Sequence, residues 1–200
     1  VRVIEHKKTK KLYALKYIDK TQCIKQKAVA NVIQERRLLE EPKDRPLQQI
    51  DHPFLVNMRY AFQDDENCFF VLDLMLGGDL RFHLERTGSL SEELLDVAIH
   101  SDIKPDNILL DAHGNAHLTD FNVAIQSKEL IHGMAGSIAY MAPEILIKRG
   151  YTCCVDWWSL GVCAYELMFG KRPFMGRTND ELSNSIRNSP VKFPEDSRKM

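Results

Sequence analysis

One short segment of the sequence gathers side chains that could move a phosphoryl group. It reads Asp102-Ile-Lys-Pro-Asp-Asn107 and offers a carboxylate, an ammonium group and an amide oxygen within six residues. A second carboxylate, Asp120, follows thirteen residues after Asn107. Phosphoryl transfer needs a carboxylate to take the proton of a hydroxyl, a cation to offset charge on the migrating group, and oxygen ligands for Mg²⁺. The segment therefore indicates a phosphotransfer site.

An ordinary polar turn is the alternative interpretation, because Asp, Pro and Asn are frequent turn formers. The surrounding sequence favours chemistry. Short apolar runs at 108–110 and 116–118 predict two strands between Asn107 and Asp120. The segment Ala142-Pro-Glu144 follows, with Glu144 24 residues after Asp120.

The composition limits the class of protein. The 200 residues are 44% hydrophobic and 28% charged, with a formal net charge of -1, which is typical of globular domains and argues against a nucleic-acid-binding protein. No apolar run is long enough to span a membrane. Five cysteines without metal-site spacing predict neither disulfides nor zinc, and favour a reducing, intracellular (cytoplasmic) setting. Because the chain opens on Val1 without a signal peptide, we interpret it as a fragment that starts inside a domain.

The elements that must position these residues change in type along the chain. Apolar and aromatic runs predict strands, helical spacing predicts one helix, and Pro42 and Pro46 end that helix. The break at Gly77-Gly78 precedes a mainly helical remainder. We therefore expect an α+β, two-lobed architecture with small-lobe residues 1–76, large-lobe residues 77–200 and a hinge near 74–78. The expected early elements are strands over 1–5, 12–18, 58–62 and 68–74 and a helix over 28–39.

With these motifs in order, the sequence resembles the eukaryotic protein kinases over nearly its whole length. Tyr13-Ala-Leu-Lys16 is similar to their Val-Ala-Ile-Lys motif, and Glu35, nineteen residues later, stands where the helix C glutamate pairs with that lysine. The segments HPFLV (52–56) and DWWSLG (156–161) resemble the AGC group of serine/threonine kinases, and Lys104 is typical of serine/threonine kinases. Asp120-Phe-Asn122, with Asn where most kinases have Gly, resembles the YANK branch of that group.

The resemblance implies ATP and Mg²⁺ as cofactors and assigns roles to the polar motif residues. Asp102 would be the catalytic base and Lys104 the cation beside the migrating phosphoryl group. Asn107 and Asp120 would bind Mg²⁺. Lys16 would anchor the α- and β-phosphates, and the carboxylate of Glu35 would hold the Lys16 ammonium group in place.

The resemblance also implies two sets of contact residues. Val1 and Ala14 would line the adenine pocket, Leu72 would be the gatekeeper, and core packing is an equal explanation for Leu72. The hinge residues Asp73 and Met75 would bond adenine, and Asp79 would contact the ribose.

The substrate set would favour protein substrates with basic residues near the target hydroxyl, since carboxylates pair with guanidinium groups. It comprises Asp79, Asp106, Ser137 and Glu166.

Several departures from the kinase pattern bear on activity. Val1 falls just after the position of the Gly-rich loop, and only ten residues separate Ser91 from Asp102, where a supporting helix E is expected. Residues 41–48 resemble an insertion, and the chain ends before the closing helices and the arginine that would pair with Glu144. Ser101 replaces the arginine that binds a phosphorylated activation loop, and Gly133 replaces the usual acceptor. We therefore expect activity to be independent of activation-loop phosphorylation, because a phosphate at Ser127 would find only Lys128 nearby.

The leading hypothesis is an ATP-dependent serine/threonine protein kinase domain, incomplete in this chain. The alternative is an inactive pseudokinase or truncated product that acts as a nucleotide- or protein-binding module. A metal-dependent hydrolase using the same carboxylates is remote, because it explains neither the Lys16–Glu35 pair nor Asp156-Trp-Trp.

Overall fold

The computed structural model describes residues 1–39, 53–87, 100–124 and 130–194. Internal contacts divide the chain into two units. The first unit comprises Val1–Gly78 and Leu109–Val123, and the second comprises Asp79–Ile108 and Ala124–Met200.

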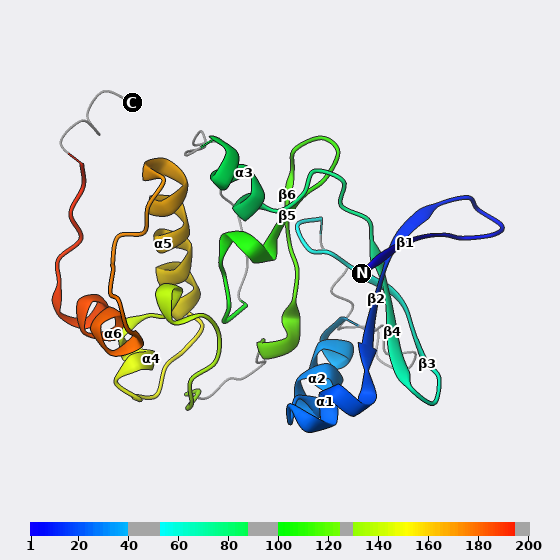
Figure 1. The fold of residues 1–200 in the computed structure, drawn as a ribbon, viewed down its shortest axis with the longest axis horizontal. Helices are drawn as coiled ribbons and strands as arrows, with labels where there is room; N and C mark the ends of the chain where they lie inside the picture. The colour runs from blue at the N-terminus through cyan, green and yellow to red at the C-terminus, as the bar shows by residue number, and fades with distance from the viewer. Residues whose placement is uncertain (40–52, 88–99, 125–129, 195–200) are drawn as a thin grey trace. The chain divides into compact units, whose positions relative to one another are not determined.

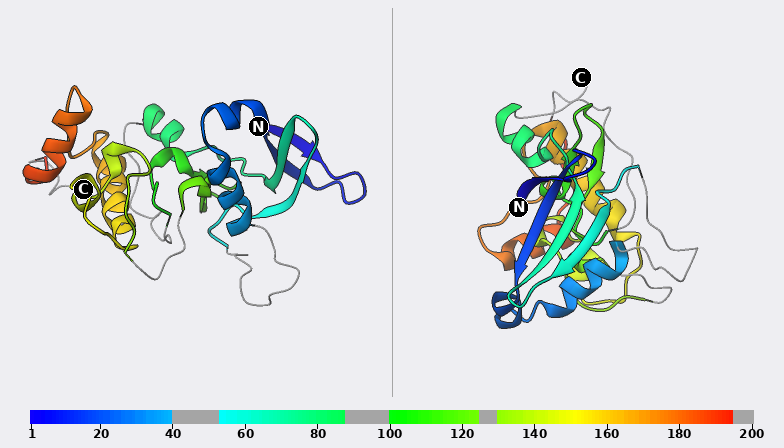
Figure 2. Two further views of the ribbon diagram at one scale, coloured as in Figure 1. Left: turned by 90° about the horizontal axis from the view of Figure 1, so that it is seen from below. Right: turned by 90° about the vertical axis from the view of Figure 1, so that its right-hand side faces the viewer.

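The first unit contains a four-stranded antiparallel sheet (Figure 1). Its order is β1-β2-β4-β3, so the central strands are β2 and β4, and the right-hand view of Figure 2 shows the strands side by side. Phe70, Val71 and Leu72 of β4 are all buried, which is expected of a central strand covered on both faces. The strands are β1 (Arg2–Glu5), β2 (Leu12–Asp19), β3 (Met58–Gln63) and β4 (Asn67–Asp73), within one residue of the predicted ends.

Two helices follow β2. The sequence analysis did not predict α1 (Lys20–Lys25), which has six residues and is capped by the Asp19 carboxylate, 2.8 Å from the Gln22 N–H. The second helix, α2 (Val29–Leu39), matches the expected helix over 28–39 and packs against η2 (Phe121–Val123). The predicted proline stop after α2 lies outside the described residues. The six residues of α1 show no apolar periodicity, so the sequence alone does not distinguish this short helix from a turn.

The hairpin of β5 (Ile108–Leu110) and β6 (Ala116–Leu118), where the sequence predicted two strands, joins the first unit through backbone hydrogen bonds. Leu118 accepts from the Val56 N–H and donates to the Phe54 carbonyl, both at 2.9 Å. A Cβ at Gly77 would lie 2.6 Å from the Leu110 Cβ, so only glycine permits this approach. The lobe boundary expected at 76/77 therefore differs from the contact division, in which residues 109–123 belong with the first unit.

The second unit is helical. Its longest helix, α5 (Val155–Phe169), ends at Gly170, whose φ of 67° is left-handed and favours glycine. A buried cluster of Met141, Ala142, Ile145, Tyr151 and Val155 forms a core beside the start of α5. The other elements are α3 (Leu80–Thr87), η1 (Pro105–Asn107), η3 (Ile138–Tyr140), α4 (Pro143–Leu146) and α6 (Asn179–Asn188).

Within the described ranges, no helix has the length and apolar character that a membrane crossing requires. All five cysteines are free thiols.

Candidate active site

Asp102 is the centre of a compact polar network in the second unit. Its Oδ2 atom lies 2.7 Å from the Lys104 ammonium and 3.1 Å from the Asn107 amide nitrogen. The Asn107 amide also donates to the Asp102 carbonyl at 3.0 Å, and its backbone N–H donates to the Lys104 carbonyl in the turn that starts η1. The loop thus holds a carboxylate and an ammonium group side by side. The three polar residues that the sequence singled out here are brought together.

A second segment closes the network from the other side. The Ser137 N–H donates to Asp102 Oδ1 at 2.8 Å, and the Lys104 ammonium lies 3.0 Å from the Ser137 hydroxyl. The preceding Gly136 has a φ of +95°, and a Cβ there would lie 2.7 Å from the Ser101 carbonyl oxygen. Gly136 therefore permits an approach that another residue would block, and Ser137 lies beside the expected base.

The backbone directly before Asp102 is anchored by a buried carboxylate of α5. Asp156 accepts hydrogen bonds from the backbone N–H groups of His100 and Ser101, the latter at 2.7 Å. Burial raises the pKa of Asp156 above its ordinary value, and the two N–H donors oppose that shift. Ser101 has a φ of 64°, an uncommon conformation for a residue with a side chain. The Asp156 contacts hold this backbone directly before Asp102.

We expect Asp156→Asn to destabilise the protein. An asparagine keeps one acceptor oxygen but turns an NH₂ group toward a backbone N–H that then lacks an acceptor. Hydrogen bonds to charged groups contribute about 1.5–3 kcal/mol each, so a loss of about 2 kcal/mol in the free energy of unfolding is expected. Denaturant unfolding measures this, with exposed Asp180→Asn of α6 as the control. A stability equal to that of the control would contradict the anchoring role.

The first unit holds a second charged group. The Lys16 ammonium of β2 lies 2.7 Å from Glu35 Oε1 of α2 and 3.2 Å from Asp120 Oδ1. The pairing of Lys16 with Glu35 that the sequence predicted is present, although nineteen residues separate them. Burial would lower the pKa of Lys16, but the two carboxylates raise it above the ordinary value, so Lys16 stays protonated. Burial also raises the pKa of Glu35, which Lys16 opposes.

Asp120 has the backbone strain that often marks functional sites. Its φ is 69°, in the left-handed region, and it precedes the short turn η2. Asn122 has no positive φ, so the freedom of a glycine is not needed at this position.

The side chains of Asn107 and Asp120 suit a hard cation. The side-chain hydrogen bonds of Asn107 both use its amide nitrogen as donor. Its amide oxygen makes no hydrogen bond to the described residues. Asp120 uses Oδ1 for Lys16, and within the described chain its Oδ2 has no such partner. Mg²⁺ in phosphate-transferring sites uses one or two such protein oxygens together with phosphate oxygens. No group of three or more His, Cys, Asp or Glu among the described residues could hold a metal ion.

The expected adenine and hinge positions have mixed surroundings. Leu72 is buried opposite Ala14 in the sheet, Val1 is largely exposed, and the Asp73 carboxylate forms a two-point ion pair with Arg59. The Met75 N–H makes no hydrogen bond to the described part of the chain.

The three acids expected to meet substrate have different partners. Asp79 accepts from the Phe82 N–H at 2.8 Å and so caps α3. Asp106 is exposed in η1. Glu166 of α5 is buried and already binds the guanidinium group of Arg81. The acids are therefore not equally open to a substrate cation.

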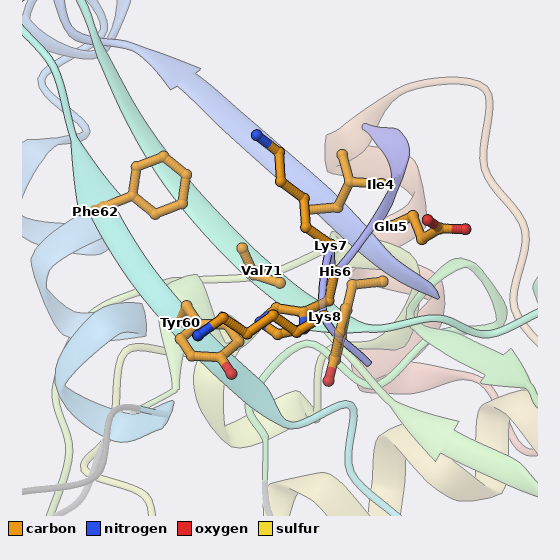
Figure 3. A pocket seen from close by; sticks show the side chains of 9 residues that line it. Ile4, Glu5, His6, Lys7, Lys8, Tyr60, Phe62 and Val71 are labelled. Carbon is orange, nitrogen blue, oxygen red and sulfur yellow. The ribbon is translucent and has the colours of Figure 1, made fainter. Parts of the chain in front are cut away.

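A separate hollow of about 550 Å³ lies on the other face of the sheet (Figure 3). Tyr60, Phe62 and Val71 line it together with Lys7 and Lys8 of the turn after β1. Its residue Tyr13 is three positions from Lys16 in β2, and side chains of a strand alternate between faces. The hollow shares no lining residue with the charged groups described above.

Comparison with known proteins identifies the family. The model of the protein kinase domain matches residues 1–98 and 96–198, which is nearly the whole chain. The chain belongs to the protein kinase domain family. It is 44% identical over 195 residues to human serine/threonine-protein kinase 32B, covering 86% of this chain and 45% of the relative. It is also 45% identical over 195 residues to human serine/threonine-protein kinase 32C (86% and 38%), and 36% identical over 209 residues to serine/threonine-protein kinase sgk-1 of Caenorhabditis elegans (95% and 44%).

These relatives confirm the predicted resemblance to AGC serine/threonine kinases of the YANK-like branch and the α+β kinase fold. This chain spans less than half the length of each of them. Protein kinases use ATP and Mg²⁺. The match divides at residues 96–98, inside the stretch where the sequence predicts a missing helix E.

The structure adds three residues of the kinase domain that the sequence analysis did not assign. These residues are Asp156, which the sequence shows only as part of a family motif, Arg81 and Gly136. Their partners lie far away in sequence, so no local pattern reveals them. The only available signal was the occurrence of a charged residue or a glycine beside an expected motif.

Some predictions lie outside the described residues. They concern the insertion at 41–48, the stretch after Ser91 where helix E is expected, and the activation-loop positions Ser127 and Lys128. Gly133 is described and has a φ of 119°, which favours glycine there.

Proposed function

We propose that this kinase domain transfers the γ-phosphoryl group of ATP to serine or threonine hydroxyls of proteins. The observation that carries the proposal is the Asp102 network, in which the carboxylate lies 2.7 Å from Lys104 and 2.8 Å from the Ser137 N–H. A carboxylate held in this way is a suitable acceptor for a hydroxyl proton, since proton transfer needs a positioned base.

The residues divide the work of the reaction. Asp102 takes the proton of the substrate hydroxyl while the oxygen of that hydroxyl forms a bond to the γ-phosphorus. The bond between the γ-phosphorus and the β-phosphate oxygen breaks, and ADP is released. Lys104, next to Asp102, offsets the charge of the migrating group. Lys16, held by Glu35, would bind the α- and β-phosphates. Asn107 and Asp120 would supply oxygen ligands for Mg²⁺, which would neutralise phosphate charge.

Nucleotide and substrate contacts are part of the same proposal. The Met75 N–H, which has no partner in the described chain, bonds adenine beside Asp73, while Val1, Ala14 and Leu72 line the pocket and Asp79 meets the ribose. Basic residues of the protein substrate meet Asp79 and Asp106, since Asp106 is exposed. The free cysteines suit an intracellular, cytoplasmic location.

The second candidate function is a nucleotide- or protein-binding module without catalysis. The division of the family match at residues 96–98 favours it, because a kinase domain without helix E lacks part of the support of its catalytic loop. Nucleotide binding without phosphotransfer by the intact protein would identify this second function.

Thermal shift measurements test the nucleotide site. A ligand at 100 times its Kd stabilises a protein by about 2.7 kcal/mol, so Mg²⁺-ATP should raise the Tm of the intact protein by several degrees. We expect Asp120→Ala to remove the difference between ATP with Mg²⁺ and ATP alone, because its carboxylate holds the cation. Asp65→Ala, which removes an exposed turn carboxylate, is the matched control and should keep the full difference. An unchanged Mg²⁺ response of Asp120→Ala would refute the metal role.

A further inference from the structure

An arginine of the chain itself fills an acidic pocket beside the catalytic loop. Arg81 of α3 donates through Nη1 to Glu166 Oε1 at 2.9 Å and through Nη2 to Glu166 Oε2 at 3.2 Å. Its Nη2 also donates to the Tyr140 hydroxyl, and its Nε lies 3.5 Å from Asp106 Oδ2. The guanidinium group therefore meets two carboxylates and a hydroxyl, and its planar fork matches Glu166 at two points.

The Glu166 end of the pocket is buried and its carboxylate is paired, while Asp106 lies at the exposed end. Glu166 is only 6% exposed, and the Tyr140 hydroxyl donates to its Oε2 atom. Burial raises the pKa of Tyr140, so the hydroxyl remains protonated and able to donate. The hydrogen bond to Glu166 raises the pKa of Arg81 further above its ordinary value. A buried carboxylate that has lost its only cation is strongly disfavoured, so Glu166 needs a guanidinium or an equivalent partner.

The position of the pocket connects it to substrate binding. Asp106 stands in η1 between Lys104 and Asn107, so one wall of the pocket belongs to the loop that carries Asp102. Arg81 of α3 and Glu166 of α5 are 85 residues apart in sequence, and their ion pair connects the two helices. An arginine of a bound peptide could reach Glu166 only by displacing Arg81. One guanidinium group would then replace another.

We infer that Arg81 is a specificity-determining residue, which occupies the Glu166 pocket in place of a substrate arginine. This inference rests on the proposed protein kinase function and concerns the choice of protein substrate. With Arg81 present, Glu166 gives no selection for arginine, and a basic preference comes from Asp79 and Asp106 alone. Removal of Arg81 leaves Glu166 free to bind the guanidinium group of a substrate. The protein then selects for arginine at one further position of the peptide.

Paired peptides test this in the intact protein. One serine peptide has neutral residues before the acceptor, and its partners carry a single arginine scanned through those positions. The measured quantity is kcat/KM for each arginine peptide divided by that for the neutral peptide in the same variant, so general losses cancel. We expect Arg81→Met to raise this ratio by about 10-fold to 100-fold at one position, mainly through KM. Adding Glu166→Gln to Arg81→Met should remove the gain.

Peptide binding without ATP gives a second readout that does not depend on catalysis. Fluorescence anisotropy should show tighter binding of the same arginine peptide than of its neutral partner by Arg81→Met, and no such difference at that position for the unaltered protein. If no variant phosphorylates any peptide but this binding difference appears, the proposed kinase function fails and the assignment of the pocket stands. If phosphotransfer occurs but Arg81→Met changes neither the kcat/KM ratio nor the difference in peptide binding, the inference about Arg81 is overturned.

A conservative variant keeps the test decisive if Arg81→Met does not fold. Arg81→Lys retains a cation but lacks the two-point fork, so a substrate guanidinium should compete with it for Glu166. We expect an intermediate rise of the arginine ratio, about 3-fold to 10-fold, at the same position. An unchanged ratio in a folded Arg81→Lys protein would show that Arg81 only joins α3 to α5.

Discussion

Asp102→Asn in the intact protein is expected to reduce kcat for a serine peptide by about 10²-fold to 10⁴-fold. Asparagine has the shape of aspartate and can still accept the Ser137 N–H, which lies 2.8 Å from Asp102 Oδ1. It cannot take a proton from the substrate hydroxyl at neutral pH. The Lys104 ammonium, 2.7 Å from Oδ2, also loses its counter-charge. The effect therefore falls on the chemical step.

Binding of ATP separates this effect from a general loss of structure. Lys16, which is proposed to bind the α- and β-phosphates, belongs to the first unit, and the amide of asparagine at position 102 keeps an oxygen that can accept from Asn107. The Kd for ATP should therefore change by less than about threefold in Asp102→Asn. The control is Asp65→Asn, an exposed carboxylate of the turn between β3 and β4, which should keep both kcat and the Kd. Wild-type kcat in Asp102→Asn would end the assignment of Asp102 as the base.

The second large effect is expected at Lys16. Lys16→Met removes the cation proposed to bind the α- and β-phosphates, and loss of a preorganised charge-stabilising group costs about 10²-fold to 10³-fold in rate. It also leaves Glu35 buried without its partner at 2.7 Å. Breaking a buried pair costs about 3–5 kcal/mol, less here to the extent that Glu35 takes up a proton. We therefore expect lower values of both kcat/KM for ATP and the free energy of unfolding.

A double variant distinguishes the two losses. Lys16→Met with Glu35→Gln removes the uncompensated carboxylate, so part of the stability should return while kcat/KM for ATP stays low. Lys25→Met, at the exposed end of α1, is the matched control and should change neither quantity greatly. Recovery of activity in the double variant would show that Lys16 acts through stability and has no direct part in nucleotide capture.

Local patterns predicted much of this fold because strands and loops depend on neighbouring residues. Alternating and β-branched runs gave the four strands of the first sheet and the short strands at 108–110 and 116–118. The loop from Asp102 to Asn107 places three polar groups together because only five positions separate its ends. The Lys16–Glu35 pair required more than periodicity, and the resemblance to protein kinases supplied it.

Other features of the site could not be predicted because their partners are brought together only by packing. Asp156 reaches the backbone of Ser101 across 55 residues, and Ser137 reaches Asp102 across 35. Taken alone in the sequence, such polar residues resemble solvated surface residues, since nothing nearby records what will cover them. The expected substrate acid Glu166 shows this most clearly, because its partner is Arg81 of the same chain.

The sequence by itself determined the inventory of reactive groups, the order of the strands along the chain and the membership in the protein kinase family. The tertiary structure alone decided which of those groups are paired, buried or open to a ligand. The physical reason is that the type of a side chain sets which partners it can accept, while its actual partner depends on segments that meet only after folding. Arg81 and Glu166, 85 residues apart and joined at 2.9 Å, are the clearest case in this chain.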